Sequence, residues 1–263
     1  MATGQHSRRK FGVLFGMGVV GVLSLLPVYI PQLRQLATTG GAHGWSLPAL
    51  VVASVFQFLF LMALGVALGM AFAPRLHLRS HIAAWAAREP KLSPGFWKEA
   101  PLALGLGALT ALVLLVLDHF FAPSMGEATA QKLYILQDLP LNQKVMNVLH
   151  GGINEELIYR WGLASFLAWL IGSVRGKASG SPPAGTMWAA IVLAALVFGA
   201  AHLPVFVGQS IVALTTPVVV RTVVLNAIAG IVFGWLYFRR SLEAAMLAHA
   251  MLHITWAILS YLV

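Results

Sequence analysis

Apolar residues are gathered into seven long runs along this chain, and short polar breaks separate them. Most runs hold about 20 residues, the length that a helix needs to cross the hydrocarbon core of a bilayer. They are too long and continuous for barrel strands, and backbone groups in lipid must pair internally. The pattern predicts an all-α, polytopic transmembrane helix bundle of about seven helices, at residues 11–30, 50–73, 102–121, 146–171, 187–207, 219–238 and 242–262.

The composition agrees with a membrane protein, because 59% of the 263 residues are hydrophobic and only 10% are charged. A soluble domain has about 25% charged residues. The net charge of +9 raises the question of nucleic-acid binding, but no basic stretch is interleaved with aromatic residues as such a surface requires. We therefore expect a lipid bilayer and no nucleic acid as a partner. The chain contains no cysteine, which excludes disulfides, thiol nucleophiles and cysteine metal ligands.

Basic residues are distributed unevenly between the two sets of loops. Apart from Arg160, which lies inside a predicted span, twelve lysines and arginines fall on one side and four on the other. Cytoplasmic loops are enriched in Lys and Arg, so we expect a multi-pass protein of the cell membrane, in bacteria the inner membrane, with its N-terminus in the cytoplasm. The twelve are Arg8, Arg9, Lys10, Arg75, Arg79, Arg88, Lys91, Lys98, Arg175, Lys177, Arg239 and Arg240, and the four are Arg34, Lys132, Lys144 and Arg221.

Two segments have more than one interpretation. The first apolar run follows three basic residues, but it is longer than a signal-peptide core of roughly 7–15 residues, so an uncleaved span is preferred over a signal peptide. The stretch 74–100 carries Trp85, Phe96 and Trp97 among basic residues. It is a candidate interfacial amphipathic segment on the cytoplasmic side, with a solvated loop as the alternative.

Several smaller features have structural interpretations. Three pairs of glycines at a spacing of four residues fit close helix packing: Gly12 and Gly16, Gly65 and Gly69, and Gly230 and Gly234. Asp118 and His119 lie where they can reach the membrane interface. The histidines outside the spans are expected to be solvated, namely His6, His43, His77 and His81.

Charged residues inside a membrane span are costly and mark a functional site by default. The fourth span contains Glu155, Glu156 and Arg160. Residues four apart share a helix face, so Glu156 and Arg160 can form an ion pair. Glu155 is rotated by about 100° from Glu156 and is left as a free carboxylate. A purely structural trio that ties the span to its neighbours is the alternative.

Three histidines complete the set of ionisable residues deep in the last spans. His202 precedes a proline at the end of the fifth span, and His249 and His253 share one face of the seventh. In one chemistry, Glu155 and His202 hold and deprotonate a water that attacks an amide, while His249 and His253 donate hydrogen bonds to the oxyanion. In the other, the three histidines and Glu155 bind a zinc ion whose water is the nucleophile.

The order of these motifs resembles the CAAX protease and bacteriocin-processing (CPBP, or Abi) family, which includes the Rce1-type glutamic intramembrane proteases. The motifs are EExxxR from Glu155 to Arg160, FxxxH from Phe198 to His202, and HxxxB from His249 to His253. The resemblance covers residues 145–263, the catalytic helices. Residues 1–144 then supply the N-terminal transmembrane helices and a cytoplasmic loop within one integral membrane unit.

The resemblance implies a role for each residue. Glu155 activates the water with help from His202, His249 and His253 stabilise the oxyanion, and Glu156 and Arg160 support the site. The family usually has Asn or Asp at the last position, and His253 departs from that pattern. Asn226, in the sixth span, is a further candidate, with a helix-packing hydrogen bond as the alternative.

The sequence thus predicts an intramembrane endopeptidase that needs no cofactor, with zinc as the alternative. Its expected substrate is a membrane-associated peptide or protein, either lipidated or a C-terminal sorting anchor. Two other classes stay open: a non-catalytic scaffold with the same fold, and a proton-coupled transporter that uses the Glu and His residues as a relay.

Overall fold

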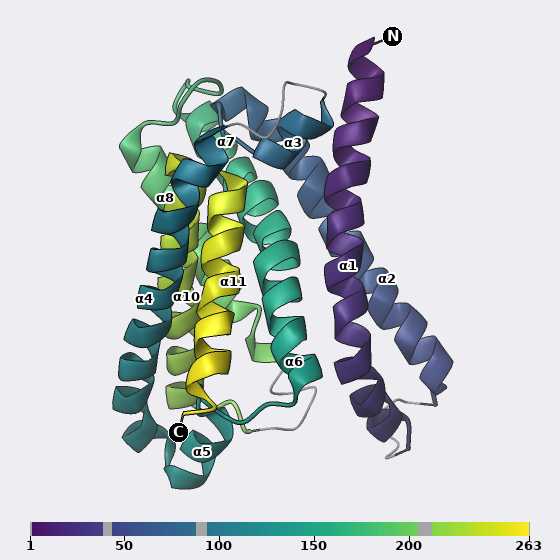
Figure 1. Cartoon of the computed structure of the whole chain (residues 1–263), viewed down its shortest axis with the longest axis vertical. Helices are drawn as coiled ribbons and strands as arrows, with labels where there is room; N and C mark the ends of the chain where they lie inside the picture. The colour runs from purple at the N-terminus through teal and green to yellow at the C-terminus, as the bar shows by residue number, and fades with distance from the viewer. Residues whose placement is uncertain (1, 39–43, 88–93, 205–211, 263) are drawn as a thin grey trace.

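The computed structural model is a bundle of helices, and it describes residues 2–38, 44–87, 94–204 and 212–262 (Figure 1). No strand occurs in these ranges. The helices are α1 (Ala2–Thr38), α2 (Leu47–Phe72), η1 (Pro74–Leu76), α3 (His81–Ala86), α4 (Pro94–Met125), α5 (Glu127–Leu133), α6 (Leu141–Met146), η2 (Asn147–Ala164), α7 (Ser165–Val174), α8 (Ala184–Ala200), α10 (Thr216–Arg239) and α11 (Leu242–Leu259).

Each of the seven predicted spans corresponds to a helix of the bundle. Within the described ranges, six helical stretches are long and apolar enough to cross a membrane, and α8 is a shorter apolar helix of 17 residues. At 1.5 Å per residue α8 is about 25 Å long, close to the thickness of the hydrocarbon core. The fold is therefore the predicted polytopic helical bundle. The end of the predicted fifth span, residues 205–207, lies outside the described residues.

The long helices run in alternating directions, so the bundle has two distinct ends. Figure 1 shows the N-terminus, α3 and α7 at one end and α5, α6 and the C-terminus at the other. We call the first the basic end. Its described basic residues are Arg8, Arg9, Lys10, Arg75, Arg79, Lys98, Arg175, Lys177, Arg239 and Arg240, whereas Arg88 and Lys91 lie outside the described residues. Arg34, Lys132, Lys144 and Arg221 belong to the opposite end.

The fourth span is one continuous helix, α6–η2–α7, and its middle part is wound more widely than an α-helix. Residues Asn147–Ala164 are π-helical, so each turn closes on the fifth residue instead of the fourth. The sequence pattern predicts an ordinary α-helix here, because apolar periodicity does not report the winding. Because the turn is wider, side chains five residues apart lie close to one another along this helix, and Glu155 is one of the residues affected.

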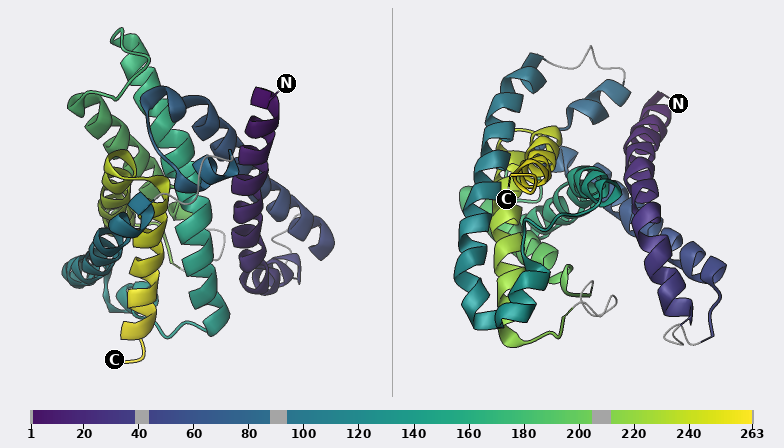
Figure 2. Two further views of the ribbon diagram at one scale, coloured as in Figure 1. Left: turned by 45° about the horizontal axis from the view of Figure 1, so that its top comes forward. Right: turned by 60° about the horizontal axis from the view of Figure 1, so that its bottom comes forward.

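The η2 helix lies at the centre of the bundle. It contacts α1, α2, α8, α10 and α11, and its Leu157 and Trp161 are buried in the main apolar cluster. Figure 2 shows α1 and α2 along one edge of the bundle, with α4, α10 and α11 grouped on the other side. Residues on η2 are therefore enclosed by helices from both halves of the chain.

Two of the three glycine pairs allow close helix contact, as predicted. A Cβ atom on Gly65 would lie 2.8 Å from the Cα of Ile158 in η2, and one on Gly230 would lie 2.8 Å from the Cβ of Ala195 in α8. The prediction is wrong for Gly12 and Gly16, because added Cβ atoms there would meet nothing within 4 Å. That face of α1 has no neighbouring helix at close range.

The stretch between α2 and α4 is tied to the start of α11 by one carboxylate. Glu243 accepts hydrogen bonds from the Ser80 hydroxyl (2.6 Å) and from the backbone N–H groups of His81 and Ile82 (2.9 Å each). His81 is buried, and its Nε2 lies 3.2 Å from Glu99. The expectation that His81 is solvated is wrong, because the loop folds back onto the bundle. His6 and His77 are exposed, and His43 lies outside the described residues.

The candidate interfacial segment is made of several short pieces. Only η1 and the six-residue helix α3 lie between α2 and residue 87, and Phe96 and Trp97 belong to the first turns of α4. The indoles of Trp85 and Trp97 are 47% and 69% exposed, so both rings can lie at a membrane surface.

Near the opposite end, Asp118 and Arg221 form a buried ion pair with an N–O distance of 2.7 Å. The Arg221 guanidinium also donates to the carbonyl of Leu133 (2.8 Å). Asp118 was expected to reach the interface, and that is wrong because α10 covers it. The pair joins α4 to α10.

Candidate active site

The site is built around Glu156, which is fully buried and has two cationic or polar partners. The Arg160 guanidinium lies 3.0 Å from Glu156 Oε1, the ion pair that the spacing predicts. His249 of α11 lies 2.8 Å from the same oxygen through its Nδ1. A carboxylate only accepts, so Nδ1 carries the proton. Glu156 therefore fixes the orientation of the His249 ring as well as the position of Arg160.

The Arg160 side chain is held between two aromatic rings. Its guanidinium carbon lies 4.5 Å from the ring centre of Phe198 and 5.3 Å from that of Phe233. His249 is stacked on Phe233 at 4.5 Å. Cation–π contacts are stronger where water is excluded, so these rings replace part of the hydration that Arg160 loses. Glu156, Arg160 and His249 thus form one packed unit between η2, α8, α10 and α11.

Glu155 is the neighbour of Glu156 but faces a different set of side chains. Its carboxylate oxygens lie 3.6 Å from His249 Nε2, 4.0 Å from His202 Nε2 and 4.0 Å from His150 Nε2. The side chain is 17% exposed, whereas that of Glu156 is 0% exposed. The prediction that the two carboxylates point to different surroundings agrees with this geometry.

His202 lies just beyond the end of α8 and is oriented by its own backbone. Its Nδ1 lies 2.8 Å from the carbonyl oxygen of Phe198. A carbonyl only accepts, so Nδ1 carries a proton. In the neutral form of the ring, Nε2 then has a lone pair that faces Glu155. Two acceptors 4.0 Å apart do not bond directly, but one water can donate to both. This gap has the right size for a single bridging water.

His253 lies one turn beyond His249 on α11. The two imidazoles are stacked with ring centres 5.1 Å apart, and the indole of Trp256 contacts His253 at 5.6 Å. Trp256 is itself fixed by a hydrogen bond from its indole N–H to the carbonyl of Ala111 (3.0 Å). The departure from the usual Asn or Asp is thus accommodated by ring stacking.

Asn226 lies at the cavity, and its hydrogen bond stays within its own helix and does not join two helices. Its side-chain N–H donates to the carbonyl of Thr222 in the same helix (2.9 Å), and the residue also lines the cavity that contains Glu155. The hydrogen bond fixes the amide group and leaves its carbonyl oxygen as an acceptor at the cavity wall.

Sequence reasoning missed His150 as a member of the site. It precedes Glu155 by five residues, a spacing that places two side chains about 140° apart on an α-helix at about 100° per residue. The π-helical winding of η2 brings the two together instead. His150 also contacts Phe58 of α2 edge-on at 5.7 Å, and its Nδ1 is buried without a hydrogen-bond partner among the described residues. Its position in the same span was the only signal in the sequence.

A cavity of about 450 Å³ opens onto Glu155. His150, His202 and His253 line it together with Tyr29 of α1 and Tyr159 of η2. No Lys or Arg is among the described residues that line it. The size suits a peptide segment of a few residues, and the polar groups converge on one side of it.

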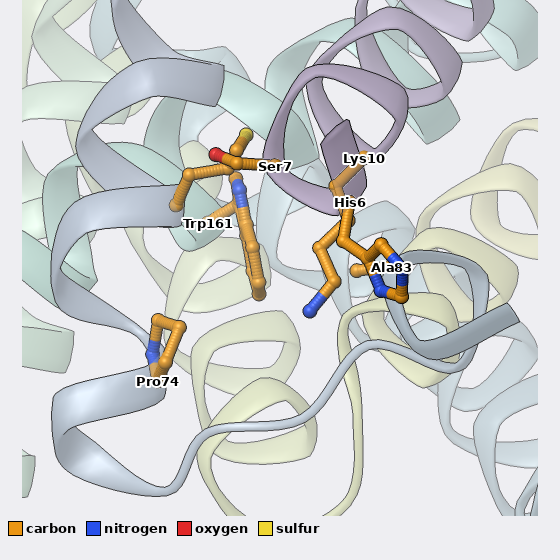
Figure 3. A pocket seen from close by; sticks show the side chains of 7 residues that line it. His6, Ser7, Lys10, Pro74, Ala83 and Trp161 are labelled. Carbon is orange, nitrogen blue, oxygen red and sulfur yellow. The ribbon is translucent and has the colours of Figure 1, made fainter. Parts of the chain in front are cut away.

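A second pocket, of about 390 Å³, lies at the basic end (Figure 3). Figure 3 shows the Trp161 indole and the Lys10 side chain facing the same space, with His6 beside them. No carboxylate is among the described residues that line this pocket, and it shares no lining residue with the cavity at Glu155. The carboxylate–imidazole chemistry is therefore confined to the first cavity.

Metal binding and a serine nucleophile are the two other chemistries that these helices could offer. Across the described ranges, no group of three His, Asp or Glu side chains has an arrangement that could hold a metal ion. Ser165, a hydroxyl in the same span, is buried and hydrogen bonded to the hydroxyl of Tyr237 (2.6 Å). Ser165 does not line the cavity that contains Glu155. Its hydroxyl is therefore not placed to act as a nucleophile.

The family model described as type II CAAX prenyl endopeptidase Rce1-like matches residues 138–255. That range contains all three motifs and the whole Glu155–Glu156 site. No curated protein and no solved structure matches the chain. Over residues 138–255, this chain is therefore similar to the Rce1-like type II CAAX prenyl endopeptidases.

Proposed function

We propose that the protein is an intramembrane endopeptidase that hydrolyses a peptide bond with a water activated by Glu155. The observation that carries the proposal is the position of the Glu155 carboxylate, 4.0 Å from His202 Nε2 and 3.6 Å from His249 Nε2, at the wall of a cavity. A bridging water at this position donates one hydrogen bond to Glu155 and one to His202. These two bonds orient the water so that its oxygen faces a substrate carbonyl.

Hydrolysis then proceeds in two proton transfers. The water oxygen bonds to the carbonyl carbon while its proton passes to Glu155, and the carbonyl oxygen becomes an oxyanion. The C–N bond breaks as Glu155 returns that proton to the leaving amine. Acid–base catalysis by one carboxylate in both directions contributes about 10²–10⁴-fold.

His249 and His253 are the proposed oxyanion donors. Because Nδ1–H of His249 is directed to Glu156, Nε2 can donate to an oxyanion only when the ring carries both protons. Since Glu156 is already paired with Arg160, the nearest carboxylate not so paired is Glu155, 3.6 Å from Nε2. His253, stacked on His249, donates as a neutral ring, as an Asn would at this position.

The direct test compares variants of the full chain in membranes. Glu155→Gln and His202→Ala are expected to abolish cleavage while the protein folds and inserts normally. Glu127→Gln, in the exposed part of α5, is the matched control and keeps activity. Peptides that accumulate in the Glu155→Gln membranes, identified by mass spectrometry, are the candidate substrates. Full activity in either site variant would contradict the proposal.

The zinc mechanism makes a different prediction from the same residues. A metal-free glutamate mechanism is insensitive to strong chelators. Inhibition by a chelator that added zinc reverses would instead support a metal held by Glu155 and the histidines. Lipidated chains and C-terminal sorting anchors are the two substrate types to be compared in this assay.

A further inference from the structure

The cavity at Glu155 lies toward one end of the bundle. Tyr159 of η2 and Asn226 of α10 line its deeper part. Other lining residues come from the last turns of α1 (Tyr29, Gln32), from α6 and the start of η2 (Gln143, Asn147), and from the second half of α11 (Trp256). These latter segments all lie toward the end opposite the basic end (Figure 1).

Access from the basic end is closed by the core of η2. Directly beyond Glu155 in the chain, Glu156, Leu157, Arg160 and Trp161 are between 0% and 3% exposed. The side chain of His202, 4.0 Å from Glu155, is 31% exposed. The pocket at the basic end (Figure 3) stops at Trp161 and does not join the cavity. Ile158 and Tyr159, which lie between Leu157 and Arg160, are half-buried and line the cavity, whereas Gly162, Ala164 and Ser165 are buried and close the helix toward α7.

The rim of the cavity has the chemistry to bind a peptide backbone. Gln32, Gln143 and Asn147 carry side-chain amides that can each donate and accept a hydrogen bond. No charged side chain accompanies them among the described lining residues except Glu155. An uncharged, extended stretch of chain fits such a rim better than a chain end with a free carboxylate, for which no cation is supplied.

We infer that the cavity receives its peptide from the non-cytoplasmic face of the membrane, and that its substrates are membrane-anchored chains cut at that face. The inference rests on the proposed protease function and on the charge asymmetry of the bundle, since the end that carries most Lys and Arg faces the cytoplasm. Ten described basic residues lie at the basic end, against four at the opposite end where the cavity opens. Substrates anchored at the cytoplasmic surface would meet the closed end.

The absence of cysteine from the chain allows a direct test with single-cysteine variants. Gln143→Cys places a thiol at the cavity rim, Leu141→Cys places one at the same end on a residue that is 70% exposed, and Ser7→Cys places one at the basic end. Each full-length variant is treated with a membrane-impermeant maleimide in spheroplasts and in inverted membrane vesicles.

We expect Leu141→Cys and Gln143→Cys to be labelled in spheroplasts, and Ser7→Cys only in inverted vesicles. Labelling Gln143→Cys from outside should also abolish cleavage, whereas labelling Leu141→Cys should leave it unchanged. Failure of Gln143→Cys to react in spheroplasts would overturn the inference.

The labelling pattern does not depend on protease activity. The proposed protease function and the proposed side of substrate access can therefore be contradicted independently of each other. If Glu155→Gln retains full cleavage, the proposed function is wrong whatever the labelling shows. If Glu155→Gln is inactive but the rim reacts only in inverted vesicles, the protease assignment stands and the side of access is wrong.

Discussion

At the scale of single residues, the central feature is that Glu156 serves two partners at once. It neutralises Arg160 and it orients His249, at 3.0 Å and 2.8 Å. A residue with both contacts links folding to the proposed catalysis, because its loss leaves a buried cation and an imidazole without its acceptor. The two roles can be separated by replacing both Glu156 and Arg160 with uncharged residues, which leaves no unpaired charge but still removes the acceptor of His249.

We predict that Glu156→Leu alone destabilises the protein by about 3–5 kcal/mol, because it leaves Arg160 buried without a counter-charge. Glu156→Leu combined with Arg160→Met should restore most of that stability, since apolar replacements of buried pairs are often neutral. Cleavage should stay low in the double variant because His249 has lost its acceptor. Thermal unfolding in detergent and a cleavage assay check the two parts, and wild-type activity in the double variant would refute the positioning role.

A second prediction concerns His253. His253→Asn, the residue usual in the family, should keep cleavage within about tenfold, or about 1.4 kcal/mol in barrier height. His253→Ala should lower the rate by about 10²–10³-fold, the usual effect of removing one oxyanion donor. The measurement is the initial rate at equal amounts of membrane-inserted protein. Equal rates for the Asn and Ala variants would exclude hydrogen bonding by this position.

These residues also show what the sequence can reveal. The ion pair of Glu156 and Arg160 follows from a local spacing of four residues, and the free face of Glu155 follows from the same rule. The contact of Glu156 with His249 joins residues 93 positions apart, and no local spacing encodes it. His81 was assigned to solvent because nothing nearby in the sequence indicates that Glu99 and Glu243 approach it from α4 and α11.

At the scale of elements, the close crossing of α2 and η2 positions the helix that carries the site. Gly65 allows the backbone of Ile158 to approach, and Gly162 faces Gly65 from the other helix. The predicted spans identify both helices correctly, but the periodicity of apolar residues cannot show which glycines lie at a crossing. Gly12 and Gly16 have the same spacing and meet no neighbour.

We predict opposite effects for two Gly→Ala substitutions. Gly65→Ala should destabilise the protein by about 1–3 kcal/mol, because the new Cβ meets backbone atoms that must shift. Gly16→Ala, the matched control in α1, should be stabilising by about 0.5–1 kcal/mol, the gain of Ala over Gly inside a helix. Unfolding midpoints of the two variants in the same detergent decide the sign. A neutral Gly65→Ala would mean that the crossing is looser than described.

The start of α11 gives a further prediction at this scale. Glu243 accepts three hydrogen bonds from the 80–82 stretch, so Glu243→Ala leaves the backbone N–H groups of His81 and Ile82 without acceptors. We expect a loss of about 2–3 kcal/mol for a buried charged acceptor and faster amide hydrogen exchange at both positions. Amide hydrogen exchange of the residues where α10 packs on α8 should be unchanged, and it serves as the internal control. Unaltered protection at His81 would contradict the role of Glu243.

At the scale of the whole molecule, the seven helical passes place the two termini at opposite ends of the bundle (Figure 1). The distribution of basic residues predicts that the N-terminus lies in the cytoplasm. The length and number of the apolar runs were sufficient to predict this architecture. The position of the cavity relative to the two ends required the structure, because its rim combines α1, α6 and α11.

Reporter fusions test the orientation of the whole bundle. Alkaline phosphatase, which is active only outside the cytoplasm, should be active when fused after residue 263 and inactive when inserted in the loop at 178–181. The loop belongs to the basic end, next to Arg175 and Lys177. The reverse pattern of activity would invert the assigned topology. Immunoblots of the two fusions control for expression.

The winding of η2 has a consequence for sequence alignments of related proteins. His150 lies within 4.0 Å of Glu155 only because a π-helical turn holds one residue more than an α-helical turn. Deleting a single residue between the two would leave them four apart, a spacing that shares one face of an ordinary α-helix. The pair would then stay together without the π-helical turn, and EExxxR, FxxxH and HxxxB would all remain intact. An alignment scored on those motifs would not detect the change. The residue count between His150 and Glu155 is therefore a separate character to compare, independent of which residues occupy the motifs.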